Sequence, residues 1–193
     1  MKNLFFLLSV LLIISCNCNK KEPISETKIE VIEELTINQI MKDTVDDVDM
    51  LLGQVNKKGF KNEPFSTWFD TEFSGYTINE AVIDSIQPLV EHVTLKVFMG
   101  TWCEDSQRET PRLYKVLEAI DFNKDNLEII AVSRDKDTPN HLEEGQNIEY
   151  VPTIIVLKNE KEIGRIVEST IDSLEEDLLA ILSGKEYKHA YAE

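Results

Sequence analysis

The sequence predicts an α/β fold in which a central mixed β-sheet is flanked by helices. Residues 93–99, Val-Thr-Leu-Lys-Val-Phe-Met, form an apolar run rich in β-branched side chains, which is typical of a strand. A segment of helical period follows, because Leu113, Val116, Leu117 and Ile120 share one helix face. Strand-like and helix-like segments then keep alternating, an order that places helices on both faces of a sheet. We therefore expect a three-layer architecture.

The packed unit is predicted to begin at Asp43, where apolar residues recur up to Leu52. Residues 64–76 hold an aromatic cluster near helical spacing, which is either core packing or a partner surface; its members are Phe65, Trp68, Phe69, Phe73 and Tyr76. Residues 77–80 offer cap-like side chains before a short amphipathic helix that Pro88 ends. These segments are an N-terminal helical extension of the domain.

The remaining elements follow the strand at 93–99 in a regular order. We expect a helix at about 103–120, a strand at 127–132 and a polar loop that runs through Gln146. An apolar strand at 154–157, a polar hairpin turn at 158–162, a strand at 163–167 and a closing amphipathic helix complete the domain. The domain thus spans residues 43–188, and residues 189–193 form a C-terminal tail that should fray.

The first fifteen residues are a targeting segment. Lys2 precedes an apolar run of about eleven residues, which is too short for a stable membrane span. Ile13-Ile14-Ser15-Cys16 resembles a bacterial lipobox, which implies a lipoprotein signal peptide at residues 1–15 and lipidation of Cys16. Residues 16–42 then read as a lipidated N-terminus and acidic tether. We expect a protein of the bacterial cell envelope, held to a membrane by lipid without crossing it; ordinary signal-peptide cleavage and a signal anchor are the alternatives.

Cys103 is the main candidate for chemistry, because it stands between the predicted strand and the start of the helix. The positive end of the helix dipole favours the thiolate, the form that attacks disulfides. Glu104 and Asp105 in the first turn repel such a negative charge, and Arg108 and Arg112 could compensate if either turns back toward the sulfur. The alternative is an inert, buried cysteine.

Trp102-Cys103 resembles the thioredoxin superfamily, and further positions carry the same resemblance. Ser106 stands where that family has the second cysteine of Cys-x-x-Cys, and Pro111 matches the proline within its active-site helix. Val151-Pro152-Thr153, before the later apolar strand, is similar to the family's cis-proline loop. The flanking residues 98–109 also look like bacterial envelope proteins with Cys-x-x-Ser sites. The resemblance covers roughly residues 60–188 and implies a thioredoxin-like fold.

The resemblance implies a monothiol oxidoreductase or isomerase. Cys103 would be the nucleophile and Ser106 a possible hydrogen-bond donor to its sulfur, while Trp102, Val151, Pro152 and Thr153 would contact the substrate. Partners would be protein thiols or disulfides, or low-molecular-weight mixed disulfides. Without a resolving cysteine in the motif, exchange is chemically easier than net dithiol reduction. Because Ser106, Glu104 and Asp105 depart from the catalytic pattern, a non-catalytic module that binds peptides or an envelope partner is the alternative function.

The charge, the glycine count and the histidine spacing argue against nucleic-acid, phosphate and metal binding. Twenty basic and thirty-six acidic residues give a net charge of −16, which argues against nucleic acid as a partner. Only seven glycines occur, none in a phosphate-binding cluster, and His92, His141 and His189 lack metal-ligand spacing, so we expect no cofactor and no metal. With Cys16 lipidated, Cys18 and Cys103 remain; Cys18 is a passive thiol or a resolving thiol for Cys103.

Overall fold

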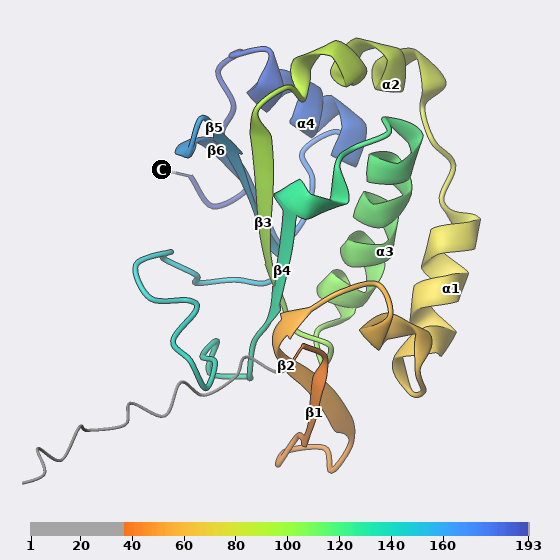
Figure 1. Ribbon diagram of the computed structural model, residues 1–193, viewed down its shortest axis with the longest axis vertical. Coiled ribbons are helices and arrows are strands. Elements are labelled where there is room, and N and C mark those ends of the chain that lie inside the picture. Colours follow the sequence, from red (N-terminus) through yellow and green to blue (C-terminus); the bar gives the residue numbers. More distant parts are fainter. Residues whose placement is uncertain (1–36, 193) are drawn as a thin grey trace, which may run out of the picture. The chain divides into compact units, whose positions relative to one another are not determined.

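The computed structural model describes residues 37–192 of the chain, which fold as an α/β unit around a mixed six-stranded sheet (Figure 1). Its strands are β1 (Gln39–Lys42), β2 (Asp49–Val55), β3 (Val93–Met99), β4 (Leu127–Ala131), β5 (Thr153–Lys158) and β6 (Lys161–Val167). The helices are α1 (Phe65–Gly75), α2 (Glu80–Ile86), α3 (Glu104–Ala119) and α4 (Leu174–Leu182). The predicted α/β class, with a mixed sheet flanked by helices, is confirmed.

The strands lie in the order β1-β2-β4-β3-β5-β6. β3 and β4 are parallel and are connected through α3, whereas β5 pairs with β3 and with β6 in antiparallel register. β2 is antiparallel to β4, with Gly53 opposite Ala131. The β3–α3–β4 crossover therefore leaves the start of α3 at the carboxyl end of β3, beside the beginning of β5.

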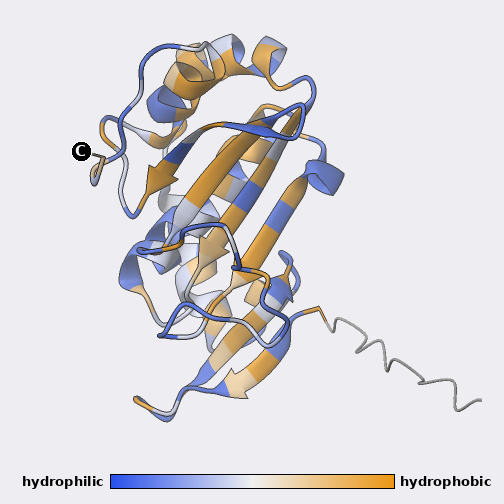
Figure 2. Ribbon diagram, turned by 90° about the vertical axis from the view of Figure 1, so that its left-hand side faces the viewer, coloured by the Kyte–Doolittle hydropathy of each residue, from blue (hydrophilic) through white to orange (hydrophobic). Residues whose placement is uncertain are grey.

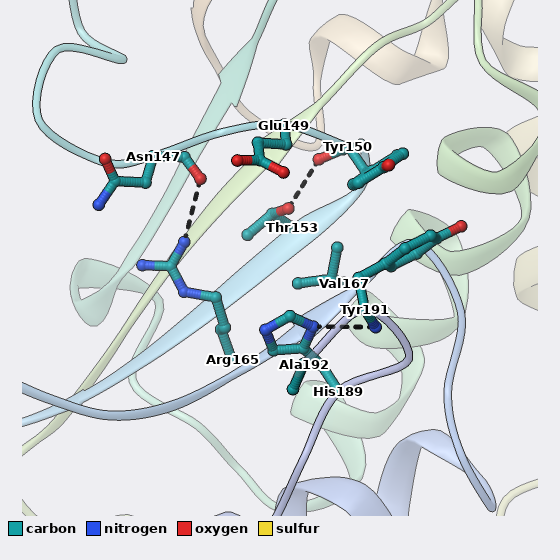
Figure 3. A pocket seen from close by; sticks show the side chains of 9 residues that line it. All are labelled: Asn147, Glu149, Tyr150, Thr153, Arg165, Val167, His189, Tyr191 and Ala192. Carbon is teal, nitrogen blue, oxygen red and sulfur yellow. Dashed lines mark hydrogen bonds between the residues drawn. The ribbon is translucent and has the colours of Figure 1, made fainter.

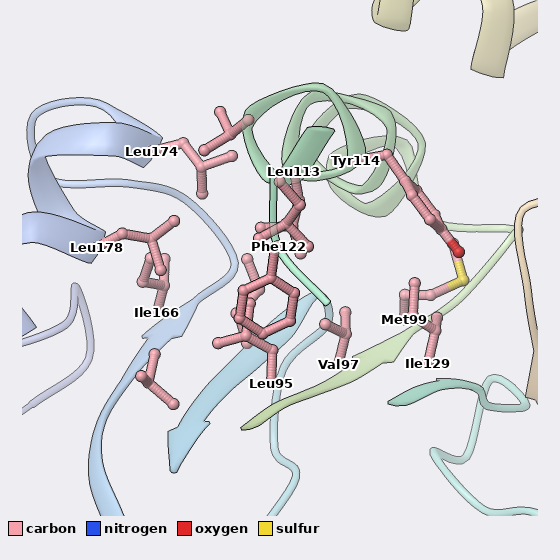
Figure 4. Packing of buried hydrophobic residues seen from close by; sticks show 14 of the residues in the cluster. Leu95, Val97, Met99, Leu113, Tyr114, Phe122, Ile129, Ile166, Leu174 and Leu178 are labelled. Carbon is pink, nitrogen blue, oxygen red and sulfur yellow. The ribbon is translucent and has the colours of Figure 1, made fainter. Parts of the chain in front are cut away.

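The main core lies between the sheet and all four helices. Inward-facing side chains of β3, such as Leu95, Val97 and Met99, meet Leu113 of α3 and Leu178 of α4 (Figure 4). These residues are almost fully buried, and each large aliphatic side chain removed from water stabilises the fold by about 1.5–3 kcal/mol. The apolar strand and the period-3.6 face of the helix thus meet as the sequence predicts.

The opposite face of the sheet differs from our expectation of helices on both faces. A second cluster there contains Phe98, Ile130 and Ile155, and Leu142 and Ile148 of the β4–β5 loop pack against it. In the described part of the chain this third layer is loop rather than helix, and Figure 2 shows the loop lying across the strands. The loop is too polar between residues 133 and 147 to present a continuous helical apolar face.

The amino-terminal border of the domain also differs from the prediction. β1 pairs with β2, so the sheet already includes residues 39–42, which the sequence assigned to the tether. The extension begins with this hairpin before α1 and α2 follow, and is therefore not entirely helical. β2 is buried on both faces, so its residues lack the alternation that identifies a half-buried strand.

Candidate functional site

Cys103 caps the amino terminus of α3. Its backbone is extended (φ −97°, ψ 123°), its N–H donates to the Gly100 carbonyl at 3.0 Å and its carbonyl accepts from the Gln107 N–H at 2.9 Å. The residue is half-buried. The first N–H groups of an α-helix have no acceptor within the helix and carry partial positive charge. Cys103 therefore stands beside the partial positive charge of a helix amino terminus.

The thiol faces the loop before β5. Cys103 Sγ lies 3.2 Å from the Val151 carbonyl oxygen, and the S–H donates to it. The Val151–Pro152 peptide bond is cis, and the Pro152 carbonyl accepts from the Glu168 N–H at 2.7 Å at the end of β6. The structure thus brings together three predicted site residues from segments 48 positions apart.

Trp102, also predicted for this site, is held from two sides. Its indole Nε1–H donates to the Val132 carbonyl at 2.9 Å, and the Arg134 guanidinium lies over its ring, 5.3 Å from the centroid. A Cβ atom on Gly100 would stand only 2.5 Å from the indole Cε2. Glycine is therefore required at this position for the ring to lie over the backbone beside the cysteine.

Arg134 connects the Trp102 ring to the β1–β2 hairpin. Its Nε donates to Asp43 Oδ2 at 2.7 Å, and its guanidinium also pairs with Asp46. The Asp43 carboxylate accepts from the Val45 N–H at 2.9 Å, and this bond, followed by Arg134, lowers the pKa of Asp43 below its ordinary value. The carboxylate stays ionised, so the hairpin is anchored to the site by charge-assisted hydrogen bonds.

Ser106 has a different partner from the predicted one. Its side chain is fully buried, and its hydroxyl oxygen accepts from the Gly100 N–H at 3.1 Å. Within the described residues, the hydrogen bond of the Cys103 sulfur is to Val151. Ser106 therefore fixes the loop that carries the cysteine, and acts on the thiol through Gly100.

Thr153 is likewise a positioning residue. It is 1% exposed, and its hydroxyl donates to the Tyr150 carbonyl at 2.7 Å. This bond closes a turn around Val151 and Pro152, which are buried as well. The backbone of this turn, rather than the Thr153 side chain, faces the sulfur.

Both arginines of α3 are engaged away from the thiol. Arg108 pairs with Asp105 at 2.6 Å and with the buried Glu109 at 2.8 Å, while Arg112 pairs with Glu72 of α1 at 2.7 Å. Neither guanidinium therefore supplies the compensation that the sequence left open. Any stabilisation of a thiolate comes from the helix terminus itself.

A cavity of about 370 Å³ lies behind the cis-proline turn, between β6, the loop and the carboxyl-terminal tail (Figure 3). The tail does not simply fray, because the Tyr191 ring stacks on Tyr150 with centroids 4.0 Å apart. The Arg165 guanidinium on the wall pairs with Glu162 and donates to the Asn147 carbonyl at 3.3 Å. Its donors hold the loop in place, which supports the turn facing Cys103.

Other predicted features lie elsewhere or outside the described residues. Cys16 and Cys18 fall outside residues 37–192. Within that range, no group of three or more His, Cys, Asp or Glu side chains is arranged to hold a metal ion. None of the helices between residues 37 and 192 is both long and apolar enough to cross a membrane.

The site contains residues that the sequence did not single out. Gly100, Val132 and Arg134 determine where the Trp102 ring lies, and the buried hairpin residue Asp43 holds Arg134. A glycine directly after a strand was visible, but nothing local indicates that it faces an indole. The contacts between Arg134 and residues about 90 positions earlier arise only from the pairing of β2 with β4.

Comparisons with known proteins support the fold and no more. No family model matches the chain, and no curated protein sequence is similar to it. Among solved structures, the chain is similar to a protein of unknown function from Pseudomonas aeruginosa, with a TM-score of 0.50 and 20% identity over 68% of this chain and 93% of that one. At this identity the likeness shows a shared fold alone.

Two thioredoxins are also similar in part. One is a mutant thioredoxin from Halobacterium salinarum, with a TM-score of 0.33 and 18% identity over 50% of this chain and 78% of that one. The other is mitochondrial thioredoxin 3 from Saccharomyces cerevisiae, with a TM-score of 0.30 and 18% identity over 50% and 86%. These scores are too low to carry an argument, so function must be argued from the site.

Proposed function

We propose that this protein is a monothiol thiol–disulfide oxidoreductase or isomerase that acts through Cys103. One observation carries the proposal: the thiol of a partly buried cysteine at a helix amino terminus lies 3.2 Å from the backbone of the turn before β5. A purely structural cysteine needs no solvent access and no facing backbone. The arrangement suits a nucleophile whose substrate lies along the Val151 turn.

The chemistry is a pair of exchange steps. The Cys103 thiolate attacks one sulfur of a substrate disulfide, forms a mixed disulfide and releases the other sulfur as a thiolate. A second thiolate, from the substrate or from a low-molecular-weight thiol, then attacks the substrate sulfur of the mixed disulfide and releases Cys103. Each step breaks one S–S bond and forms another, so the net reaction is exchange without an added oxidant.

Two features of the site assist the first step. The Val151 carbonyl accepts a hydrogen bond only from the protonated thiol, so loss of the proton frees this carbonyl for a substrate N–H. The unpaired N–H groups of the first turn of α3 then face the new negative charge. Loss of the Cys103 proton and docking of the substrate are therefore coupled at the Val151 carbonyl.

A non-catalytic peptide-binding module is the second candidate. It is favoured by the acidic residues after Cys103 and by the pairing of Arg108 and Arg112 with carboxylates rather than with the sulfur. Because position 106 is serine, which has no sulfur, an intramolecular dithiol cycle is also precluded at this motif.

The rate of alkylation of Cys103 as a function of pH separates the two candidates. An enzyme thiol should be alkylated at pH 7 at least about tenfold faster than a free cysteine peptide, because a thiolate fraction is already present. The variant Cys103→Ser gives the background from other thiols. A rate no faster than that of the peptide supports the binding module and contradicts the enzymatic proposal.

We further propose that lipid at Cys16 anchors the protein in the bacterial cell envelope. The lipobox-like sequence before Cys16 supports this, and the acidic surface makes electrostatic attachment to anionic lipid unfavourable. In a bacterial host, the intact chain should fractionate with membranes, and Cys16→Ser should release it. Equal membrane association of the two proteins would contradict the anchor.

A further inference from the structure

A second cleft, of about 250 Å³, opens on the hairpin side of Trp102. Its walls come from the β1–β2 hairpin, the start of α1 and the first turns of α3. Trp102 and Gln107 both line it, and they flank Cys103 along the chain. Because the Gln107 N–H donates to the Cys103 carbonyl, the cleft begins within one helical turn of the nucleophile.

The floor of the cleft is apolar and aromatic. It includes Val48, which is 47% exposed, together with the partly exposed rings of Trp68 and Trp102. Apolar and aromatic side chains of this kind accept a methylene chain.

The rim of the cleft is negative. Among the described residues that line it, Asp46 and Asp49 are the charged ones, with side chains 57% and 40% exposed, and none is cationic. Asp46 pairs with Arg134, and Asp49 pairs with Lys42. In each pair the aspartate side chain is solvent-exposed and uses one carboxylate oxygen. Exposed pairs of this kind are weak and exchangeable.

The negative charge around the cleft indicates which kind of ligand it binds. Residues 43–49 contain four aspartates and no basic residue, and the whole chain carries a net charge of −16. A second copy of this chain or an acidic peptide would therefore be repelled. A lysine or arginine side chain fits, because its stem can lie on the aromatic floor while its head group reaches the carboxylates.

We propose that this cleft selects polypeptide substrates that carry a lysine or arginine close to their reactive cysteine. The inference rests on the proposed function, since it assigns a substrate class to the same sulfur. In this proposal the Val151 turn holds the substrate backbone, and the cleft holds the basic side chain.

The test compares two short peptides, each joined to a small thiol by a disulfide, that differ only in lysine or glutamate beside the cysteine. The second-order rate of mixed-disulfide formation with Cys103 should favour the lysine peptide by about fivefold at low ionic strength, and salt should reduce the preference. The double variant Asp46→Asn/Asp49→Asn should lose most of it. The matched control Asp47→Asn/Asp125→Asn removes the same charge outside the cleft and should retain it.

Binding measured without chemistry separates this inference from the proposed function. Serine versions of both peptides are titrated into the Cys103→Ser variant, with and without the two cleft substitutions. A lysine preference that disappears with Asp46→Asn/Asp49→Asn supports the cleft even if no mixed disulfide forms, which would overturn only the enzymatic proposal. No lysine preference, or the same preference in the cleft variant and the control, overturns the inference.

Discussion

The substitution Gly100→Ala tests how the loop beside Cys103 is built. Gly100 donates its N–H to Ser106, accepts from the Cys103 N–H and faces the Trp102 ring. A Cβ atom there would lie 2.5 Å from the indole Cε2, 2.7 Å from Nε1 and 2.8 Å from Cζ2. Carbon atoms in good contact are about 3.5–4.0 Å apart, so the ring must move by about 1 Å.

The magnitude follows from what this movement breaks. The Trp102 Nε1–H donates to the Val132 carbonyl at 2.9 Å, and a shift of about 1 Å removes that bond, which contributes about 1 kcal/mol. Overpacking costs typically about 1–3 kcal/mol more. Alanine lowers the conformational entropy of the unfolded chain, which offsets about 0.4–1 kcal/mol of this loss of stability. We therefore expect Gly100→Ala to lower the free energy of unfolding by about 2 kcal/mol.

Urea unfolding measures this loss, which should lower the midpoint by about 1 M. Gly75→Ala is the matched control, because a Cβ atom there meets nothing within 4 Å at the end of α1, and it should be neutral or slightly stabilising. In a Trp68→Phe background, where Trp102 is the remaining tryptophan, Gly100→Ala should change the fluorescence emission of Trp102. Gly75→Ala should leave this emission unchanged. Equal stability of the two glycine variants would refute the contact between Gly100 and the indole.

Two further predictions concern residues around the site. Ser106→Ala leaves the buried Gly100 N–H without its acceptor and should lower the free energy of unfolding by about 1–3 kcal/mol. Cys103 should still form mixed disulfides in this variant. Unchanged stability together with loss of this reactivity would show that the hydroxyl acts on the sulfur instead. The pKa of Asp43 is lowered in the folded protein by the Val45 N–H and by Arg134, so its stabilisation is present above the unfolded value of about 3.9 and is lost as pH falls through the folded value. The stability difference between wild type and Asp43→Asn should therefore shrink below about pH 4, and a difference that is constant with pH would argue against the ion pair.

Local patterns predicted the central part of the fold. The apolar run at Val93–Met99 and the helical period after Cys103 were sufficient, because the burial of each element follows its own period. β2 was missed because a strand buried on both faces has no alternation, and its antiparallel pairing with β4 joins segments far apart in sequence. The one-sided arrangement of helices was missed because it depends on a loop that covers the second face.

The placement of Cys103 beside the Val151–Pro152 turn was predicted, but the residues that support this arrangement were not. Cys103, Trp102, Val151 and Pro152 meet as the resemblance implied, because they stand at the ends of adjacent strands of one sheet. The hydroxyl of Ser106 binds a backbone N–H instead of the sulfur, a choice that depends on a turn only three-dimensional coordinates reveal.

The most direct test of nucleophilic exchange at Cys103 is the mass of the intact protein after brief exposure to a small-molecule disulfide and acid quenching. A nucleophilic Cys103 predicts a single added half-disulfide that maps to Cys103, is absent from Cys103→Ser and is removed by a second thiol. An unmodified Cys103 after that exposure would contradict catalysis by this thiol.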